Sequence, residues 1–174
     1  IATVVLRRHI ADVRAIAASR DGRLIATGGH DQVVLVWEVG NWDQPLVQLA
    51  HPASVLSVAF SPDGQSVVTG SSDGKARIFG LESAPPRSVL GASPAELLAV
   101  AFSPDGQKIV TGSGDGRARI WNADGSGEPI VLAEHRAAVT AVAFSPTGTG
   151  ILTGSLDHTA RLWSLAGPRT VSVF

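Results

Sequence analysis

One pattern recurs four times in this chain at a fixed interval of 42 residues. Its most regular member is an aspartate, which occupies positions Asp31, Asp73, Asp115 and Asp157. A period in the low forties is typical of the blades of a β-propeller and of helix-pair repeats. The residues within one copy decide between these two architectures.

Each copy consists of short apolar runs separated by residues that favour turns. In the second copy, Val55–Phe60 has the composition of a strand and ends at Ser61–Gly64, where Pro at the second position and Gly at the fourth predict a turn. Three further runs follow, at 66–70, 75–79 and 87–90. Regularly spaced short strands indicate an all-β fold, and four strands per copy correspond to one propeller blade.

The fourth copy is similar to a WD repeat. The resemblance rests on the runs Val139–Pro146, Leu152–Ser155 and Asp157–Trp163, and on Glu134-His135, which stands where that family usually has Gly-His. The closing Trp-Asp pair of the family is only partly kept. The resemblance covers essentially the whole chain and implies a β-propeller of four-stranded blades. The segment 122–129 resembles bacterial members, which are often attached to signalling kinases or NTPases.

The blade boundaries follow from the repeat. We expect the outer strand of a preceding blade at 1–8, blade one at 9–50, blade two at 51–92, blade three at 93–134 and blade four at 135–174. Thr3–Leu6 and Arg169–Phe174 both align with an outer strand, although a ring closed by its own termini needs only one of them. We therefore predict an open segment of a larger propeller, whose exposed apolar flanks favour self-association.

The resemblance implies that a His, a Thr, the recurring Asp and a Trp form a buried hydrogen-bonded tetrad in each blade. A hydroxyl–His–Asp catalytic triad is the alternative, but catalytic groups are not normally repeated four times along a chain. Phe79 cannot donate a hydrogen bond and Ser93 replaces a His, so blades two and three should be held less tightly. The tetrad positions are His9, Thr27, Asp31, Trp37, His51, Thr69, Asp73, Phe79, Ser93, Thr111, Asp115, Trp121, His135, Thr153, Asp157 and Trp163.

Other candidate sites have simpler interpretations. The glycine-rich 112–116 segment lacks the Lys and the helix of a phosphate-binding loop, and the spacing of His30 and His158 fits no metal-ligand pattern. Trp42, outside the repeat register, is expected to be half-exposed. Arg77, Arg119 and Arg161 recur on third strands, where nearby acids in the sheet should oppose them. We predict no catalytic residue, no cofactor and no metal.

The resemblance places protein binding on the rim where the inner strands begin. The family positions lie three and five residues after the tetrad His and directly before the tetrad Asp. They correspond to Asp12, Arg14, His30, Ser54, Leu56, Ser72, Glu96, Leu98, Gly114, Ala138, Thr140 and Leu156. Interface hot spots favour Trp, Tyr and Arg, and Arg14 alone belongs to that group. We expect a non-catalytic scaffold or sensor module that binds other proteins or peptides and is part of a larger signalling protein or complex.

Two other functions need features that the sequence lacks. A propeller hydrolase needs acids or histidines outside the repeat register that converge on the central channel. A carbohydrate-binding propeller needs exposed aromatic side chains, whereas aromatic residues make up 5% of this chain and nearly all are in register. A net charge of −1 argues against nucleic-acid and anionic-membrane partners. Without a recognisable signal peptide or membrane-length apolar run, we expect a cytoplasmic protein.

Overall fold

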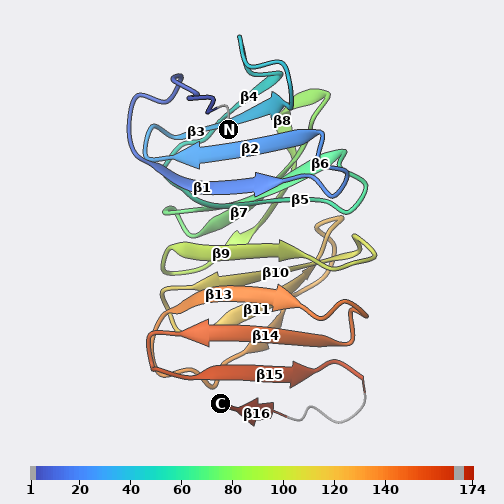
Figure 1. Cartoon of the computed structure of the whole chain (residues 1–174). Coiled ribbons are helices and arrows are strands. Elements are labelled where there is room, and N and C mark those ends of the chain that lie inside the picture. Colours follow the sequence, from blue (N-terminus) through green and yellow to red (C-terminus); the bar gives the residue numbers. More distant parts are fainter. Residues whose placement is uncertain (1–2, 167–170) are drawn as a thin grey trace.

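The structure, a computed structural model, describes residues 3–166 and 171–174. It is an all-β fold of four antiparallel sheets with four strands each, which confirms the predicted propeller blades (Figure 1). Blade one contains β1 (Val13–Ala18), β2 (Leu24–Gly29), β3 (Val33–Glu38) and β4 (Val47–Ala50). Blade two contains β5 (Val55–Phe60), β6 (Ser66–Ser71), β7 (Lys75–Gly80) and β8 (Ser83–Ala92). Blade three contains β9 (Leu97–Phe102), β10 (Lys108–Ser113), β11 (Ala118–Asn122) and β12 (Ile130–Leu132). Blade four contains β13 (Val139–Phe144), β14 (Gly150–Ser155), β15 (Ala160–Ser164) and β16 (Val171–Val173).

The predicted Ser-Pro-Asp-Gly turn joins the first two strands of blade two. The Ser61 hydroxyl donates to Asp63, whose carboxylate also accepts the N–H of Gln65. Gly64 closes the turn at a φ of 70°, a left-handed conformation that a residue without Cβ adopts readily. The same serine–aspartate pair occurs in blades one and three, as Ser19–Asp21 and Ser103–Asp105. These local bonds fix the register of the first hairpin in blades one, two and three.

The blades stack in chain order along a curved row. The inner strands β1, β5, β9 and β13 are neighbours in that order, and β1 and β13 lie at opposite ends of the row (Figure 1). Three apolar cores fill the three junctions between adjacent blades. Among the described residues no junction joins blade four back to blade one, so the propeller is an open segment.

A glycine on the second strand of each of the first three blades marks where the next blade packs. A Cβ at Gly28 would lie 2.7 Å from Val55 Cγ1 of blade two. A Cβ at Gly112 would lie 2.9 Å from Val139 Cγ1 of blade four. Real side chains do not tolerate such contacts, so the absence of a side chain at these positions lets the inner strand of the following blade approach closely.

The two terminal strands expected from the repeat differ in outcome. Residues 3–9 form no strand, because an outer strand needs a third strand to pair with, and β3 is already paired with β4. At the other end, Val171–Val173 pairs with β15 as the outer strand of blade four. Arg169 and Thr170, which we also assigned to that strand, lie outside the described residues. The described chain contains no helix capable of spanning a membrane.

Candidate functional site

Blades one and four each contain a hydrogen-bonded chain of four buried or half-buried side chains. In blade four, His135 Nδ1 lies 2.9 Å from Asp157 Oδ2 and His135 Nε2 lies 2.7 Å from Thr153 Oγ1, which accepts the Trp163 indole N–H at 2.9 Å. Because a carboxylate only accepts, Nδ1 carries the proton and Nε2 accepts from the Thr hydroxyl. Blade one repeats the arrangement. His9 Nδ1 lies 2.8 Å from Asp31 Oδ2, and His9 Nε2 lies 2.8 Å from Thr27 Oγ1. Thr27 Oγ1 also accepts the Trp37 indole N–H at 3.2 Å.

Asp157 also organises the backbone around it. Its carboxylate accepts the N–H of Arg136 at 3.0 Å and both the N–H and the hydroxyl of Thr159, at 3.0 and 2.6 Å. These hydrogen bonds, led by that of the Thr159 hydroxyl, hold the pKa of Asp157 well below its ordinary value. Asp157 therefore links the segment between β12 and β13 to the turn between β14 and β15.

Blade two departs from the expected tetrad. Asp73 does not accept from His51; both of its oxygens instead accept from the Arg77 guanidinium, at 3.2 and 2.6 Å. His51 Nδ1 turns to the carbonyl of Leu49 at 3.1 Å, while Nε2 keeps its bond to Thr69 at 2.9 Å. Burial is the main reason why the pKa of His51 falls to about 4, and the nearby positive charge of Arg77 lowers it further.

Blade three uses the same arginine-based arrangement. Arg119 binds both oxygens of Asp115, at 3.3 and 2.6 Å. Ser93, which replaces the histidine, donates or accepts at 2.7 Å from Ser113 and reaches Asp115 at 3.4 Å. Trp121 keeps its bond to Thr111 at 3.1 Å. In blades two and three a buried arginine thus takes the place at the aspartate that the histidine has in blades one and four, and the expectation that these two blades are held less tightly stays a prediction.

The arginine in blade four is diverted by a neighbouring acid. Arg161 occupies the position equivalent to Arg77 and Arg119, yet it donates to Glu134 at 2.9 Å and leaves Asp157 to His135. Blade one has Leu35 at this position, so no arginine competes there. The four aspartates thus have histidine partners in the terminal blades and arginine partners in the central blades.

A repeated backbone hydrogen bond connects each tetrad turn to the rim. In every blade, the residue before the tetrad aspartate donates its N–H to the carbonyl of the first rim position, at 2.9–3.0 Å. The donor and acceptor pairs are His30–Asp12, Ser72–Ser54, Gly114–Glu96 and Leu156–Ala138. These backbone bonds hold the two rim positions of each blade next to each other.

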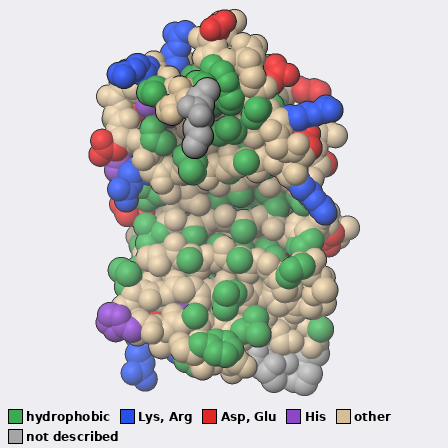
Figure 2. Space-filling view, in the orientation of Figure 1, with side chains coloured by type: hydrophobic (Ala, Val, Ile, Leu, Met, Phe, Trp, Pro, Cys, Tyr) green, Lys and Arg blue, Asp and Glu red, His purple; other side chains and the backbone are tan. Residues whose placement is uncertain are grey.

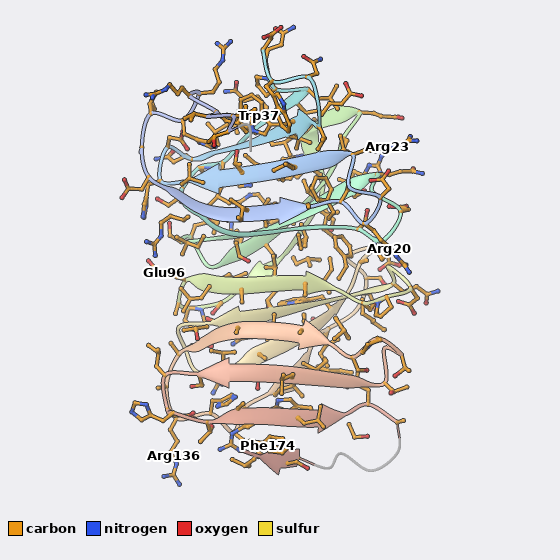
Figure 3. The ribbon with its side chains drawn as sticks, viewed as in Figure 1. Arg20, Arg23, Trp37, Glu96, Arg136 and Phe174 are labelled. Atoms are coloured by element: carbon orange, nitrogen blue, oxygen red, sulfur yellow. The ribbon has the colours of Figure 1, made fainter. Side chains whose placement is uncertain are left out.

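Eight of the twelve predicted rim residues line one hollow that extends across the blades. They are Arg14, His30, Ser54, Leu56, Ser72, Glu96, Leu98 and Thr140. Asp12, Gly114, Ala138 and Leu156 do not line it. Glu96 lies at the edge where β9 begins, and Arg20 and Arg23 lie at the opposite edge of the molecule (Figure 3).

The hollow has charged side chains on blades one and three and apolar side chains between them. Arg14 and His30 are exposed on blade one, and His30 Nδ1 is 3.1 Å from Ser54 Oγ. Leu56 and Leu98 are half-buried, on the inner strands of blades two and three, and Glu96 is exposed beside Leu98. Such a surface combines apolar contact with opposite charges, which suits an extended segment of another protein.

Within residues 3–166 and 171–174, no group of three or more His, Cys, Asp or Glu side chains converges as metal ligands would. Trp42 is half-buried in the turn before β4. The His–Asp pairs of blades one and four are buried among structural partners and do not line the rim hollow.

Comparison with known protein families agrees with this arrangement. The family model described as "WD domain, G-beta repeat" matches the chain four times, over residues 2–38, 43–80, 85–122 and 128–164. A search of the curated proteins gave no match.

Proposed function

Because this chain belongs to the WD-repeat family, we propose that it is a non-catalytic protein-interaction module that binds a segment of a partner protein in the rim hollow. Proteins of this family generally act as scaffolds. The observation that carries the proposal is that rim positions from all four blades line one continuous hollow. The wider setting that we propose is a cytoplasmic signalling protein or complex, supported by the resemblance of residues 122–129 to bacterial members of the family.

The chemistry of the hollow defines the partner segment. Leu56 and Leu98 offer apolar contact near the centre, where burial contributes most to affinity. Arg14 and His30 favour an acidic group at the blade-one end, and Glu96 favours a basic group at the blade-three end. We therefore propose a peptide whose acidic residue, apolar residue and basic residue occur in that spatial order. Since Arg14 is the single hot-spot residue type in the hollow, the affinity should be modest.

Two fluorescent peptides test this proposal. One carries an Asp, a central Leu and a Lys, separated by glycine-serine spacers. The other has the two charged residues exchanged. Binding is measured by fluorescence polarisation at low and high salt, and we expect a preference for one order of charges that weakens as salt increases. Arg14→Glu should reduce binding of the preferred peptide by about tenfold, in the range of a truncated hot spot.

The matched control is Arg20→Glu, which makes the same charge change at the opposite edge of the molecule (Figure 3). It should leave peptide binding unchanged. Equal losses in Arg14→Glu and Arg20→Glu would show that net charge, and not the hollow, governs binding. Binding that is insensitive to both substitutions and to substitution of Leu56 by Ser would rule out the hollow as the binding site.

A further inference from the structure

Asp31 of blade one has a carboxylate oxygen without a hydrogen-bond partner. Its Oδ2 accepts from His9 Nδ1 at 2.8 Å and from the N–H of Ile10 at 3.2 Å. Its Oδ1 is buried and accepts no hydrogen bond from residues 3–166 or 171–174, and the side chain as a whole is 4% exposed. Buried polar atoms in native proteins are nearly always hydrogen-bonded. This oxygen is therefore an open acceptor position in the blade-one tetrad.

The same oxygen has partners in the three other blades. In the central blades, Asp73 Oδ1 and Asp115 Oδ1 each accept from an arginine guanidinium, at 3.2 and 3.3 Å, and from a backbone N–H. In blade four, Asp157 Oδ1 accepts both the N–H and the hydroxyl of Thr159. Blade one has Leu35 where the central blades have their arginine. A guanidinium is thus what this chain itself places at the position that stays open in blade one.

A pocket of about 510 Å³ lies beside Asp31, which is enough space for a long side chain. Ile10, Val33 and Leu35 line it with apolar groups, and Gln48 contributes an amide. A long cationic side chain packs its aliphatic stem on apolar groups and turns its charged end to an acceptor. The pocket therefore offers apolar contact for the stem of an arginine and oxygen acceptors for its guanidinium.

The neighbouring outer strand differs together with this position. In blades two and three, the arginine on the third strand pairs with Val89 and Val131, respectively. In blade one, Leu35 pairs with Gln48. The amide oxygen of Gln48 is a second acceptor, and a guanidinium carries five N–H donors. Compared with the central blades, blade one thus lacks the internal donor and has an additional acceptor beside the open carboxylate oxygen.

A preceding blade does not cover this position. Blades two and three each pack against the blade before them, yet the residues there that are equivalent to Ile10, Val33 and Gln48 are exposed. They are Pro52, Lys75 and Val89 in blade two, and Pro94, Arg117 and Val131 in blade three. The pocket is therefore a surface feature of blade one itself and not part of a junction between blades.

We propose that this pocket binds the guanidinium of an arginine side chain from another protein, with Asp31 Oδ1 as its acceptor. Charged side chains of both signs lie around blade one, at the top of the view, so the overall surface charge does not select a cation (Figure 2). Selection rests on the carboxylate, and arginine suits it better than lysine because a planar guanidinium donates to two acceptors at once. Since Oδ1 is buried, an entering group has to displace part of the pocket wall. A single arginine should therefore bind weakly, with a Kd on the order of 1 mM.

Arg8 is the one cationic side chain in the lining of the pocket. Its guanidinium donates to the carbonyl of Asp43 at 2.7 Å and is thereby held at the connection between β3 and β4. A like charge at this distance from the ligand opposes binding, although water screens it at an exposed site. Arg8→Gln should therefore strengthen the binding of an arginine by about two- to threefold.

Titration with Nα-acetylarginine amide, followed by nuclear magnetic resonance of the backbone amides, tests the proposal. We expect the signals of Ile10, Val33 and Gln48 to shift, while those of Leu56 and Leu98 in the rim hollow stay in place. Nα-acetylcitrulline amide has the same shape without the charge and should bind at least about tenfold more weakly. Equal binding of the citrulline compound, or shifts confined to the rim hollow, would overturn the proposal.

Leu35→Arg supplies the missing guanidinium from within the chain. Because Arg77 and Arg119 are accommodated at the equivalent place, the variant should fold without loss of stability and bind Nα-acetylarginine amide at least about tenfold more weakly. Leu152→Arg makes the same change at an exposed leucine of blade four and should bind as the wild type does. Equal losses in both variants would assign the effect to net charge. Unchanged binding in Leu35→Arg, or its failure to fold, would show that the pocket is not an arginine site.

These results are independent of the peptide assay, because the pocket and the rim hollow share no residue. Glu96→Gln removes the carboxylate of the rim hollow. It should weaken binding of the preferred peptide and leave binding of Nα-acetylarginine amide unchanged. Loss of one activity without the other therefore separates the two proposals.

Discussion

The central blades and the terminal blades hold the same aspartate in two different ways. In blades two and three, an arginine four residues later in the chain binds both carboxylate oxygens. In blades one and four, a histidine from the preceding connection binds one oxygen and relays to a threonine and a tryptophan. The arginine bond is local within one hairpin, whereas the histidine bond joins residues 22 positions apart. The comparison shows that a repeat can keep the turn geometry while it exchanges the partner that stabilises it.

The exchange depends on competition among neighbours. Arg77 occupies both oxygens of Asp73, so His51 finds a backbone carbonyl instead. Arg161 could make the same bond, but Glu134 accepts from it. Among the three blades with this arginine, the one with an acid directly before the histidine is the one in which the histidine keeps the aspartate.

The largest expected effect is a loss of stability on removing Arg119, which we compare with removing Arg161. Arg119→Leu leaves the Asp115 carboxylate largely buried without its counter-charge, and we expect the free energy of unfolding to fall by about 3 kcal/mol. Arg161→Leu should reduce it by less than about 1 kcal/mol, because Glu134 is more than half exposed and water solvates it. Urea denaturation monitored by tryptophan fluorescence measures both losses.

A second substitution checks the cause of the first loss. Adding Asp115→Asn to Arg119→Leu removes the unpaired charge and should restore a substantial part of the stability. Equal losses for the two arginine variants, or no recovery in the double variant, would contradict the role assigned to Arg119.

The second prediction compares the two histidine environments through their threonines. Thr153→Val keeps the side-chain shape but leaves both the Trp163 N–H and His135 Nε2 without a partner, so we expect a loss of about 2 kcal/mol. Thr69→Val leaves only His51 Nε2 unmatched, since Phe79 has no donor, and should lose about 1 kcal/mol. If Thr69→Val loses more stability than Thr153→Val, the hydrogen bond between Thr153 and the Trp163 N–H is not what stabilises blade four.

The third prediction is a pH dependence from blade two. The unfolded chain protonates His51 near its ordinary pKa of 6.5, whereas the folded chain does so only near pH 4. Acid therefore favours the unfolded chain between these values, and stability should fall by about 1 kcal/mol per pH unit on lowering the pH through this window. His51→Gln should flatten that dependence in urea titrations between pH 7 and pH 4.5. An unchanged slope in the variant would assign it to other groups.

Much of the architecture followed from the 42-residue period. The alternation of apolar runs with Ser-Pro-Asp-Gly turns predicted four-stranded blades, because strands and tight turns are determined by local sequence. The family resemblance also indicated the rim, where Arg14 and Glu96 line the same hollow. The strand expected at Thr3–Leu6 is not formed, because strand formation needs a neighbour that the repeat alone does not provide.

The partners of the aspartates were not predictable in the same way. Three arginines recur in register, and sequence alone suggested nearby acids in the sheet as their partners, without indicating that these are the tetrad aspartates. Which acid each guanidinium binds depends on competition among side chains from two different loops. The repeat pattern of the sequence does not describe that competition. One signal was available: of Arg77, Arg119 and Arg161, the third alone has an acid directly before the tetrad histidine position of its blade.

The series of glycines on the second strands has a consequence for how the molecule comes apart. Each of these close contacts links a blade only to its successor, so cooperativity passes from neighbour to neighbour, as in a one-dimensional array. Melting of blade four breaks one junction, whereas melting of blade two breaks two. Partial unfolding should therefore begin at the ends of the row. Thr140 is the single residue that blade four contributes to the hollow. The chain can thus lose the order of its last blade and still present most of its binding surface.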